Sequence, residues 1–147
     1  LMSAVRLIRA VLPKMRSQKS GSILTVTSSS VKEPIDNLLL SNVFRSGVTS
    51  LIKSLSFQEA KYGIRINNLV PGFFDTERLR ELDLRNSGEW RLSLENVRKI
   101  NFEKIPMGRY GDPNEFGKAA VFLLSGAASY VTGETFVIDG GKMRTVW

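Results

Sequence analysis

Three short apolar segments alternate along the chain with two longer amphipathic segments. Residues 23–27 (ILTVT), 64–70 (IRINNLV) and 135–139 (TFVID) are rich in β-branched residues, which favour strands. Residues 37–61 and the segment that begins at Asp112 instead repeat apolar side chains at helical spacing. The order strand, helix, strand, helix, strand is typical of a parallel sheet with helices on its faces. The sequence therefore predicts the α/β class, with a doubly wound parallel sheet.

The segments around these elements carry local signals. Residues 2–17 show near-helical spacing of apolar groups, and Pro13 inside them is expected to kink or loosen the helix. Residues 28–37 form a polar loop, in which Asp36 or Asn37 is expected to cap the helix that follows.

The composition excludes several kinds of active site. The chain of 147 residues is long enough for one domain, and its 42% apolar and 24% charged residues are ordinary for a globular protein. It contains no cysteine and no histidine. Disulfides, cysteine metal sites, histidine-bound zinc and a serine–histidine triad are therefore impossible within this chain, and we expect no metal site.

Charge and hydropathy limit the expected partners. No apolar run reaches the length of about 20 residues that spans a bilayer, and no secretory signal is visible, so we expect a cytoplasmic protein without a membrane segment. The net charge is +7, and residues 1–32 carry six basic and no acidic residues. This stretch is either a solvated basic face or a surface that attracts phosphates or an acidic carrier. Nucleic-acid binding is not expected, because the basic residues are dispersed and lack a stacking aromatic motif.

The carboxyl ends of the three strands are where we expect a ligand. Open parallel sheets bind ligands beyond these ends, which here are Thr27–Ser28, Pro71–Gly72 and Asp139–Gly140. Residues 73–110 are charged over most of their length, with local helical periodicity and few strand signals. We expect one or two small helices in this insertion, which either forms a lid over an apolar substrate or packs against the domain.

Four sequence phrases resemble the short-chain dehydrogenase/reductase family, and in particular its 3-oxoacyl-carrier-protein reductase type. They are SGSILTVTSS, YGIRINNLVPGFFDT, the helix that begins with Gly-Asp-Pro, and YVTGETFVIDGG, which follow one another in the family's order over nearly the whole chain. The resemblance implies a Rossmann-like domain that binds NAD or NADP and a small-molecule carbonyl or alcohol substrate. It covers the C-terminal half of a family member, so residues 1–147 are expected to be a single, incomplete Rossmann-like domain.

The resemblance also implies three catalytic positions. In the family a serine polarises the substrate oxygen, a tyrosine transfers a proton, and a lysine four residues later lowers the tyrosine pKa and holds the nicotinamide ribose. Ser28 matches the serine, and the family spacing leads 13 residues on to Ser41 and four more to Arg45. Residues 47–55 (GVTSLIKSL) set this register without gaps. Ser28, Ser41 and Arg45 are therefore the candidate catalytic residues, with the family's tyrosine and lysine replaced.

The two replacements change the expected chemistry. A serine hydroxyl is a far weaker acid than a phenol, whose reference pKa is about 10. The guanidinium of Arg45 can still bind a ribose or diphosphate oxygen, but it stays protonated and cannot relay a proton. Tyr62, Tyr110 and Tyr130 lie outside the expected position. We expect the rate of the family reaction to be strongly reduced, since general acid–base catalysis typically contributes about 10²–10⁴-fold in rate.

Cofactor-binding positions of the family also have matches. Pro71 and Gly72 correspond to the turn that approaches the nicotinamide, and Thr76 to the threonine that binds the carboxamide or diphosphate; Arg45 is the fourth candidate. Structural interpretations are also possible. Pro71 and Gly72 could simply form a turn that ends a strand, and Thr76 could cap a helix. Ser28 could simply satisfy backbone groups of its loop. The family's glycine-rich phosphate-binding loop has no counterpart in the chain.

Two main hypotheses follow, and they differ in whether the protein is an enzyme. In the first, the chain is part of an NAD(P)-dependent oxidoreductase whose N-terminal half carries the phosphate-binding loop. In the second, it is a non-catalytic relative that serves as a binding or assembly subunit, which Ser41 and Arg45 favour. An unrelated doubly wound domain, such as a flavodoxin-like binding module, is the third. We expect a homo-oligomer or the N-terminal half to cover exposed surfaces, since the aliphatic groups of residues 2–17 and 37–61 fit a core and an interface equally.

Overall fold

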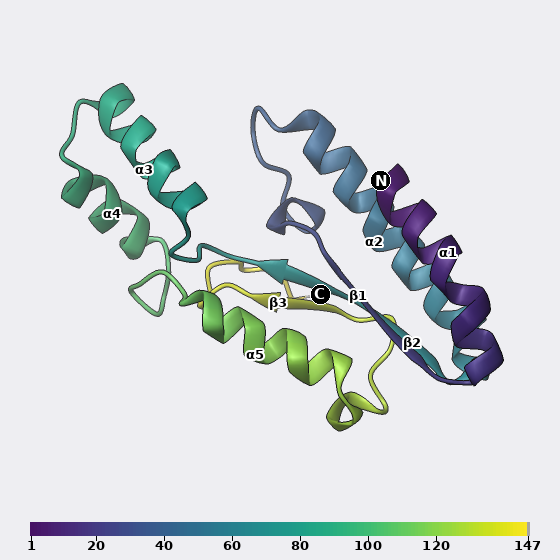
Figure 1. Ribbon diagram of the computed structural model, residues 1–147. Helices are drawn as coiled ribbons and strands as arrows, with labels where there is room; N and C mark the ends of the chain where they lie inside the picture. Colours follow the sequence, from purple (N-terminus) through teal and green to yellow (C-terminus); the bar gives the residue numbers. More distant parts are fainter. Residues whose placement is uncertain (147) are drawn as a thin grey trace.

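The computed structural model describes residues 1–146 and has the predicted α/β class. Three parallel strands form one sheet in the order β1–β2–β3 (Figure 1). The strands are β1 (Gly21–Val26), β2 (Ile64–Pro71) and β3 (Thr135–Ile138). The helices are α1 (Met2–Gln18), α2 (Leu39–Glu59), α3 (Glu77–Trp90), α4 (Leu94–Glu103) and α5 (Pro113–Leu124). Short 3-10 turns η1 (Ser29–Val31), η2 (Ala60–Tyr62) and η3 (Gly126–Ala128) follow β1, α2 and α5.

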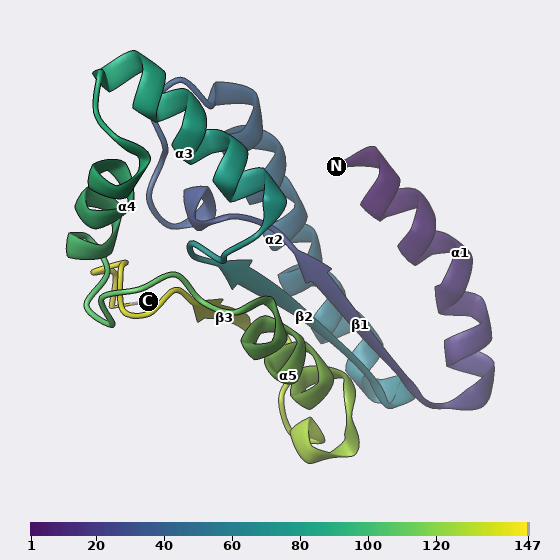
Figure 2. The same cartoon turned by 60° about the vertical axis from the view of Figure 1, so that its left-hand side comes forward.

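Helices cover both faces of the sheet, which confirms the doubly wound arrangement (Figures 1 and 2). Neighbouring residues of a strand point to opposite faces. In β2, Ile64 and Ile66 point toward α1 and α2, whereas Arg65 between them donates to the carbonyls of Leu123 (2.7 Å) and Ser125 (2.9 Å) at the end of α5. The core on the first face consists of buried aliphatic residues: Ile8, Leu12, Val48, Ile52, Ile64 and Ile66.

The carboxyl ends of the strands lie at one edge of the sheet, as parallel pairing requires. Backbone hydrogen bonds continue the pairing there: Thr27 N–H donates to Leu69 C=O (3.0 Å), and Gly72 N–H donates to Ile138 C=O (2.7 Å). The loops that follow β1, β2 and β3 therefore begin side by side.

An ion pair between Arg16 and Glu59 joins α1 to α2. Arg16 Nε donates to Glu59 Oε2 at 2.7 Å, and its Nη2 donates to Oε1. The Glu59 side chain is 0% exposed, whereas that of Arg16 is 46% exposed. The hydrogen bonds from Arg16 hold the pKa of the Glu59 carboxyl below its ordinary value, against the opposing effect of burial.

Residues 73–110 contain two helices, as predicted, and connect β2 to α5. Figures 1 and 2 show α3 and α4 together beyond the carboxyl end of β2. The segment has a small core of its own, which comprises Leu79, Ile105 and Tyr110 with Phe73 and Phe102 packed against them. It is thus a compact helical unit attached to the edge of the sheet.

The start of α2 differs from the prediction. Its N-cap residue is Leu38, which makes no side-chain cap hydrogen bond, so the prediction of a cap at Asp36 or Asn37 was wrong. Asn37 has a left-handed backbone (φ 61°). The side chain of Asn42 holds the preceding loop instead, because its Nδ2 donates to Ile35 C=O at 3.0 Å.

Two other predictions concern the N-terminal helices. Pro13 lies within α1, which continues to Gln18, and the kink expected at this proline stays a prediction. The apolar face of α2 divides in two: Val48 and Ile52 in its middle are buried, whereas Leu39 and Leu40 at its start are 74% and 67% exposed. None of the helices in residues 1–146 has the length and apolar character needed to cross a membrane.

Candidate functional site

Arg45 reaches the carboxyl end of β1. It lies in the second turn of α2, and its Nη1 donates to the carbonyl of Val26, the last residue of β1, at 3.1 Å. The guanidinium is thereby held at Val26, which precedes Ser28 by two residues. Within residues 1–146 this is the one hydrogen bond recorded from the exposed Arg45 side chain, so its other N–H groups can bind oxygen atoms of a ligand.

Ser41 and Arg45 line the same groove. The groove lies between α1, β1 and α2, has a volume of about 620 Å³, and includes Leu7 of α1 and Val26 of β1 in its lining. Ser41 precedes Arg45 by one helical turn, which places both side chains on one side of α2. The structure thus brings together the two residues that stand where the family resemblance implies tyrosine and lysine.

Ser28 begins the loop that follows β1. Its Oγ accepts a hydrogen bond from Ser30 N–H at 3.2 Å and caps η1, which packs against α2. This contact agrees with the structural interpretation of Ser28, in which the side chain satisfies a backbone group. The hydroxyl proton is not used by this contact, so Ser28 can still donate to a second partner.

The three other cofactor candidates take part in local structure. Gly72 lies so close to Asp139 that a Cβ at this position would stand 2.5 Å from the Asp139 Cα, so the packing of β2 against β3 requires glycine here. Thr76 caps α3, because its Oγ1 accepts from Leu79 N–H at 3.3 Å. Both residues, with Pro71, lie at the predicted edge, and their cofactor contacts stay predictions.

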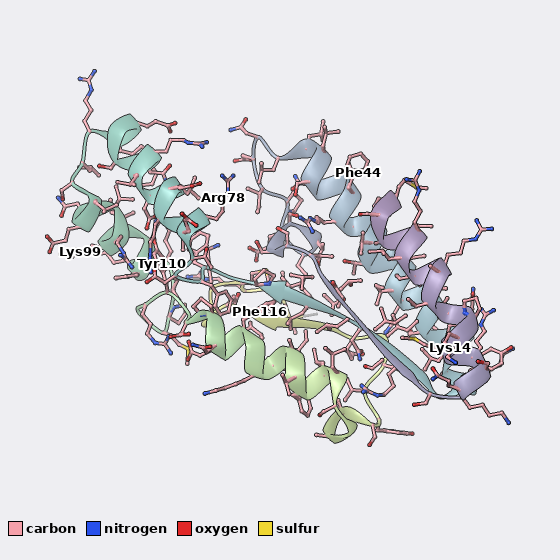
Figure 3. The ribbon with its side chains drawn as sticks, viewed as in Figure 1. Lys14, Phe44, Arg78, Lys99, Tyr110 and Phe116 are labelled. Atoms are coloured by element: carbon pink, nitrogen blue, oxygen red, sulfur yellow. The ribbon has the colours of Figure 1, made fainter. Side chains whose placement is uncertain are left out.

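A smaller pocket of about 200 Å³ lies at the same edge near the start of α5. Phe74 contributes to its wall and makes an edge-to-face contact with Phe116 of α5, which Figure 3 labels. Arg109 and Glu115 pair beside it through two hydrogen bonds of 2.8 and 2.7 Å. These bonds, with that from the Asp112 backbone, lower the pKa of Glu115 to about 2. The pair is thus fully ionised at neutral pH.

None of the three tyrosines, all of which are described, takes the place of a proton donor beside Ser41. Tyr62 belongs to η2, just before the amino end of β2. Tyr130 is fully exposed and borders a pocket with Gly21, at the amino end of β1. Tyr110 is buried in the core of residues 73–110.

The sequence reasoning missed a buried polar network around Tyr110, which lies beside α4 in Figure 3. Its hydroxyl donates to Asp83, and Asn101 Nδ2 donates to both Asp83 Oδ1 (3.1 Å) and Tyr110 Oη (2.9 Å). Burial raises the pKa of Tyr110 to about 12, so this phenol holds its proton at neutral pH. A signal did exist: Asp83 follows Leu79 by four residues and so occupies the apolar face of α3.

Comparisons with known proteins agree with the fold. A family model described as "Enoyl-(Acyl carrier protein) reductase" matches residues 1–142. The 3-oxoacyl-[acyl-carrier-protein] reductase FabG of Vibrio harveyi is 33% identical over 138 residues, which cover 92% of this chain and 51% of that protein. The oxidoreductase UcpA of Escherichia coli (strain K12) is 35% identical over 137 residues, or 91% of this chain and 50% of that protein.

A solved structure has the same arrangement of elements. L-sorbose reductase from Gluconobacter frateurii, complexed with NADPH and L-sorbose, superposes with a TM-score of 0.91 at 27% identity, over 99% of this chain and 56% of that chain. The chain thus spans about half the length of the relatives it matches. Because the family model covers nearly the whole chain, the protein belongs to the short-chain dehydrogenase/reductase family.

Proposed function

We propose that the full-length protein is an NAD(P)-binding oxidoreductase that acts on a carbonyl or hydroxyl group of a small molecule. The observation that carries the proposal is the position of Arg45, whose guanidinium reaches the end of β1 and shares a groove with Ser41. Its exposed positive charge fits the oxygen atoms of a dinucleotide. L-sorbose reductase is complexed with NADPH, which makes NADPH the first cofactor to test and NAD the alternative.

Each candidate residue has a defined role in this proposal. The cofactor, when bound, supplies or accepts a hydride at the substrate carbon. Arg45 binds a ribose or diphosphate oxygen through its free N–H groups. Ser28 polarises the substrate oxygen through a hydrogen bond from its hydroxyl, while its Oγ still accepts from the loop backbone. Pro71, Gly72 and Thr76 border the nicotinamide.

Ser41 is the candidate residue that is least suited to catalysis. It stands at the family's proton-donor position, and a serine hydroxyl releases a proton far less readily than a phenol. We therefore expect carbonyl reduction to be slower than in relatives with tyrosine, by about 10²-fold or more. The same observation favours a second candidate function, a non-catalytic binding or assembly subunit. The exposed Leu39 and Leu40 offer such a subunit an apolar surface for an oligomer or for an N-terminal half.

Residues 73–110 are part of the same proposal, as a lid over the substrate. Their separate core and their place beyond the carboxyl end of β2 support this role. A lid at this edge would exclude water from the groove that Arg45 lines.

The test is a titration of the full-length protein with NADPH, followed by nicotinamide fluorescence. We expect saturable binding that Arg45→Gln weakens about tenfold or more, because a hydrogen bond to a charged group contributes about 1.5–3 kcal/mol. Lys14→Gln, which removes an exposed charge from α1, is the matched control and should bind as the wild type does. No binding of NADPH or NADH at millimolar concentration would refute the oxidoreductase proposal. Binding without turnover of any ketone would favour the binding subunit.

A further inference from the structure

Asn68 is a fully buried polar residue of the middle strand, and it joins three elements. Its side chain is 0% exposed and lies on the sheet face that α2 covers. Thr25 Oγ1 of β1 donates to its Oδ1 at 2.9 Å. Its Nδ2 donates to Oγ1 of Thr27, at the end of β1, at 2.8 Å and to Oγ1 of Thr49 of α2 at 3.3 Å. The amide thus has the partners that burial of such a group requires.

The partners of Asn68 stand next to the candidate site residues. Thr27 immediately precedes Ser28 and is itself buried. Thr49 follows Arg45 by one helical turn, and its Oγ1 donates to the Arg45 carbonyl at 3.1 Å. One amide therefore links β2 to the end of β1 and to the turn of α2 that carries Arg45. Hydrogen bonds have defined directions, so this network restricts the position of α2 over the strands in addition to the aliphatic packing.

The preceding residue, Asn67, provides an internal comparison. It is 1% exposed, and because strand residues alternate it points to the opposite face of the sheet. Its Nδ2 donates to Val131 C=O at 2.9 Å, and its Oδ1 accepts from Glu134 N–H at 3.0 Å. Asn67 thus holds the loop before β3 and leaves the loop after β1 and the turn of Arg45 untouched.

We infer that Asn68 is a positioning residue for the site, which sets the placement of Ser28 relative to Arg45 without contacting a ligand. The catalytic consequence of this inference rests on the proposed function, whereas its structural consequence does not. An apolar residue at position 68 would free the hydroxyls of Thr27 and Thr49 from their common partner. A displacement of about 1 Å at a reacting group can lower a rate by about 10²-fold.

The experiment compares Asn68→Leu with Asn67→Leu in the full-length protein. Leucine keeps the branched shape of the asparagine side chain but replaces its amide by two bulkier methyl groups, so each variant loses the hydrogen bonds of one buried amide and both carry the same added volume. We expect both variants to lose stability, and only Asn68→Leu to lower kcat for NADPH-dependent carbonyl reduction, by about 10- to 100-fold, while KM changes far less. Equal losses of kcat in the two folded variants, or no loss in Asn68→Leu, would overturn the inference.

Hydrogen exchange gives a second measurement that does not depend on activity. The amides of Val31 and Lys32 donate to the carbonyls of Ser28 and Ser29, so their exchange reports on the loop after β1. Exchange should be faster in Asn68→Leu than in Asn67→Leu, and equal rates would overturn the inference. If the wild type neither binds NADPH nor reduces a ketone, the proposed function fails, and this exchange comparison still decides the inference.

A milder pair of variants guards against loss of folding. Asn68→Ser and Asn67→Ser each keep one hydroxyl that can replace part of the hydrogen bonding. If the leucine variants do not fold, the same measurements on the serine pair apply. We then expect Asn68→Ser alone to show faster exchange of the loop amides and a lower kcat, and identical behaviour of the two serine variants would overturn the inference.

Discussion

The hydroxyl of Tyr110 donates to the buried carboxylate of Asp83, whose two oxygens both lie 3.0 Å from it. This pair ties the segment after α4 to the middle of α3, and Asn101 of α4 donates to both of its members. Asp83 is 1% exposed, so its side-chain oxygens depend on these donors for their hydrogen bonds. The network therefore holds residues 73–110 together as one unit.

Replacing Tyr110 by phenylalanine should destabilise this unit. The substitution removes a donor from the buried Asp83 carboxylate while keeping the ring that packs against Phe73 and Phe102. We expect the free energy of unfolding in urea to fall by about 1–3 kcal/mol. Tyr130→Phe is the control, since Tyr130 is fully exposed, and it should match the wild type. Equal stability of the two variants would contradict the role given to the network.

The ion pair between Arg16 and Glu59 predicts a specific pH dependence of stability. Because Arg16 lowers the pKa of Glu59 from about 4.5, the folded state gains stability from the pair above that ordinary value, and loses it as the pH falls through the lowered pKa. Glu59→Gln should therefore be less stable than the wild type at pH 7, by about 1–3 kcal/mol, and the difference should shrink as the solution becomes more acidic than the ordinary pKa.

The measurement is urea unfolding of the wild type and of Glu59→Gln, from pH 7 down to pH values below the ordinary pKa of Glu59. Glu134→Gln serves as the control, because Glu134 is 61% exposed and lies 3.8 Å from Lys53 in a solvated pair, which contributes little. A Glu59→Gln difference that stays constant from neutral to acidic pH would show that the charge of Glu59 is not what stabilises the contact between α1 and α2.

Two glycine substitutions should have opposite effects on stability. Alanine at Gly72 would place a Cβ 2.5 Å from the Cα of Asp139, so β2 and β3 must move apart; we expect a loss of about 1–3 kcal/mol. Gly88 lies inside α3, and an added Cβ there meets no described atom within 4 Å. Gly88→Ala should therefore stabilise the protein by about 0.5–1 kcal/mol, since glycine is unfavourable in helices. Thermal unfolding of both variants checks the signs. If Gly72→Ala left the stability unchanged, the contact with Asp139 would not require glycine, and close approach of a ligand would be its only remaining role.

Restoring the family's side chains tests whether Ser41 and Arg45 limit turnover. We expect Ser41→Tyr combined with Arg45→Lys to raise kcat/KM for NADPH-dependent ketone reduction in the full-length protein by about 10²-fold or more, because a phenol then occupies the proton-donor position. Ser46→Tyr, an exposed residue of the same helix, should leave the rate unchanged. Equal activity of the double variant and the wild type would show that these two positions do not determine the rate.

The elements with strong local signals were predictable. The strand at 64–70 was found within one residue of β2, because its β-branched residues are bounded by glycine and proline. The helix start at Asp112 was also correct, since Asp112 and Glu115 form a capping box whose members are three residues apart. The start of α2 was not: Asp36 and Asn37 lie in the preceding loop, which the hydrogen bond from Asn42 to Ile35 holds, and Leu38 is the N-cap residue.

The candidate site was predictable as a place but not as a set of contacts. Parallel strands end at one edge, so the alternation of elements was enough to bring Ser28 and Pro71 there. The hydrogen bond from Arg45 to Val26 spans 19 residues and depends on how α2 lies over β1. Nothing in the local sequence specifies that contact.

The sequence alone determined the order of strands and helices, the absence of histidine and cysteine chemistry, and the choice of Ser41 and Arg45 as candidates, whose match to the family's tyrosine and lysine stays a prediction. They follow from local periodicity and residue identity, which need no partner. Only the tertiary structure decided that Asn68 bonds to Thr27 and Thr49, and that Asp83 is buried against Tyr110. The physical reason is that a buried polar group selects its partner by direction and distance across separate elements, and these exist only after the elements have packed.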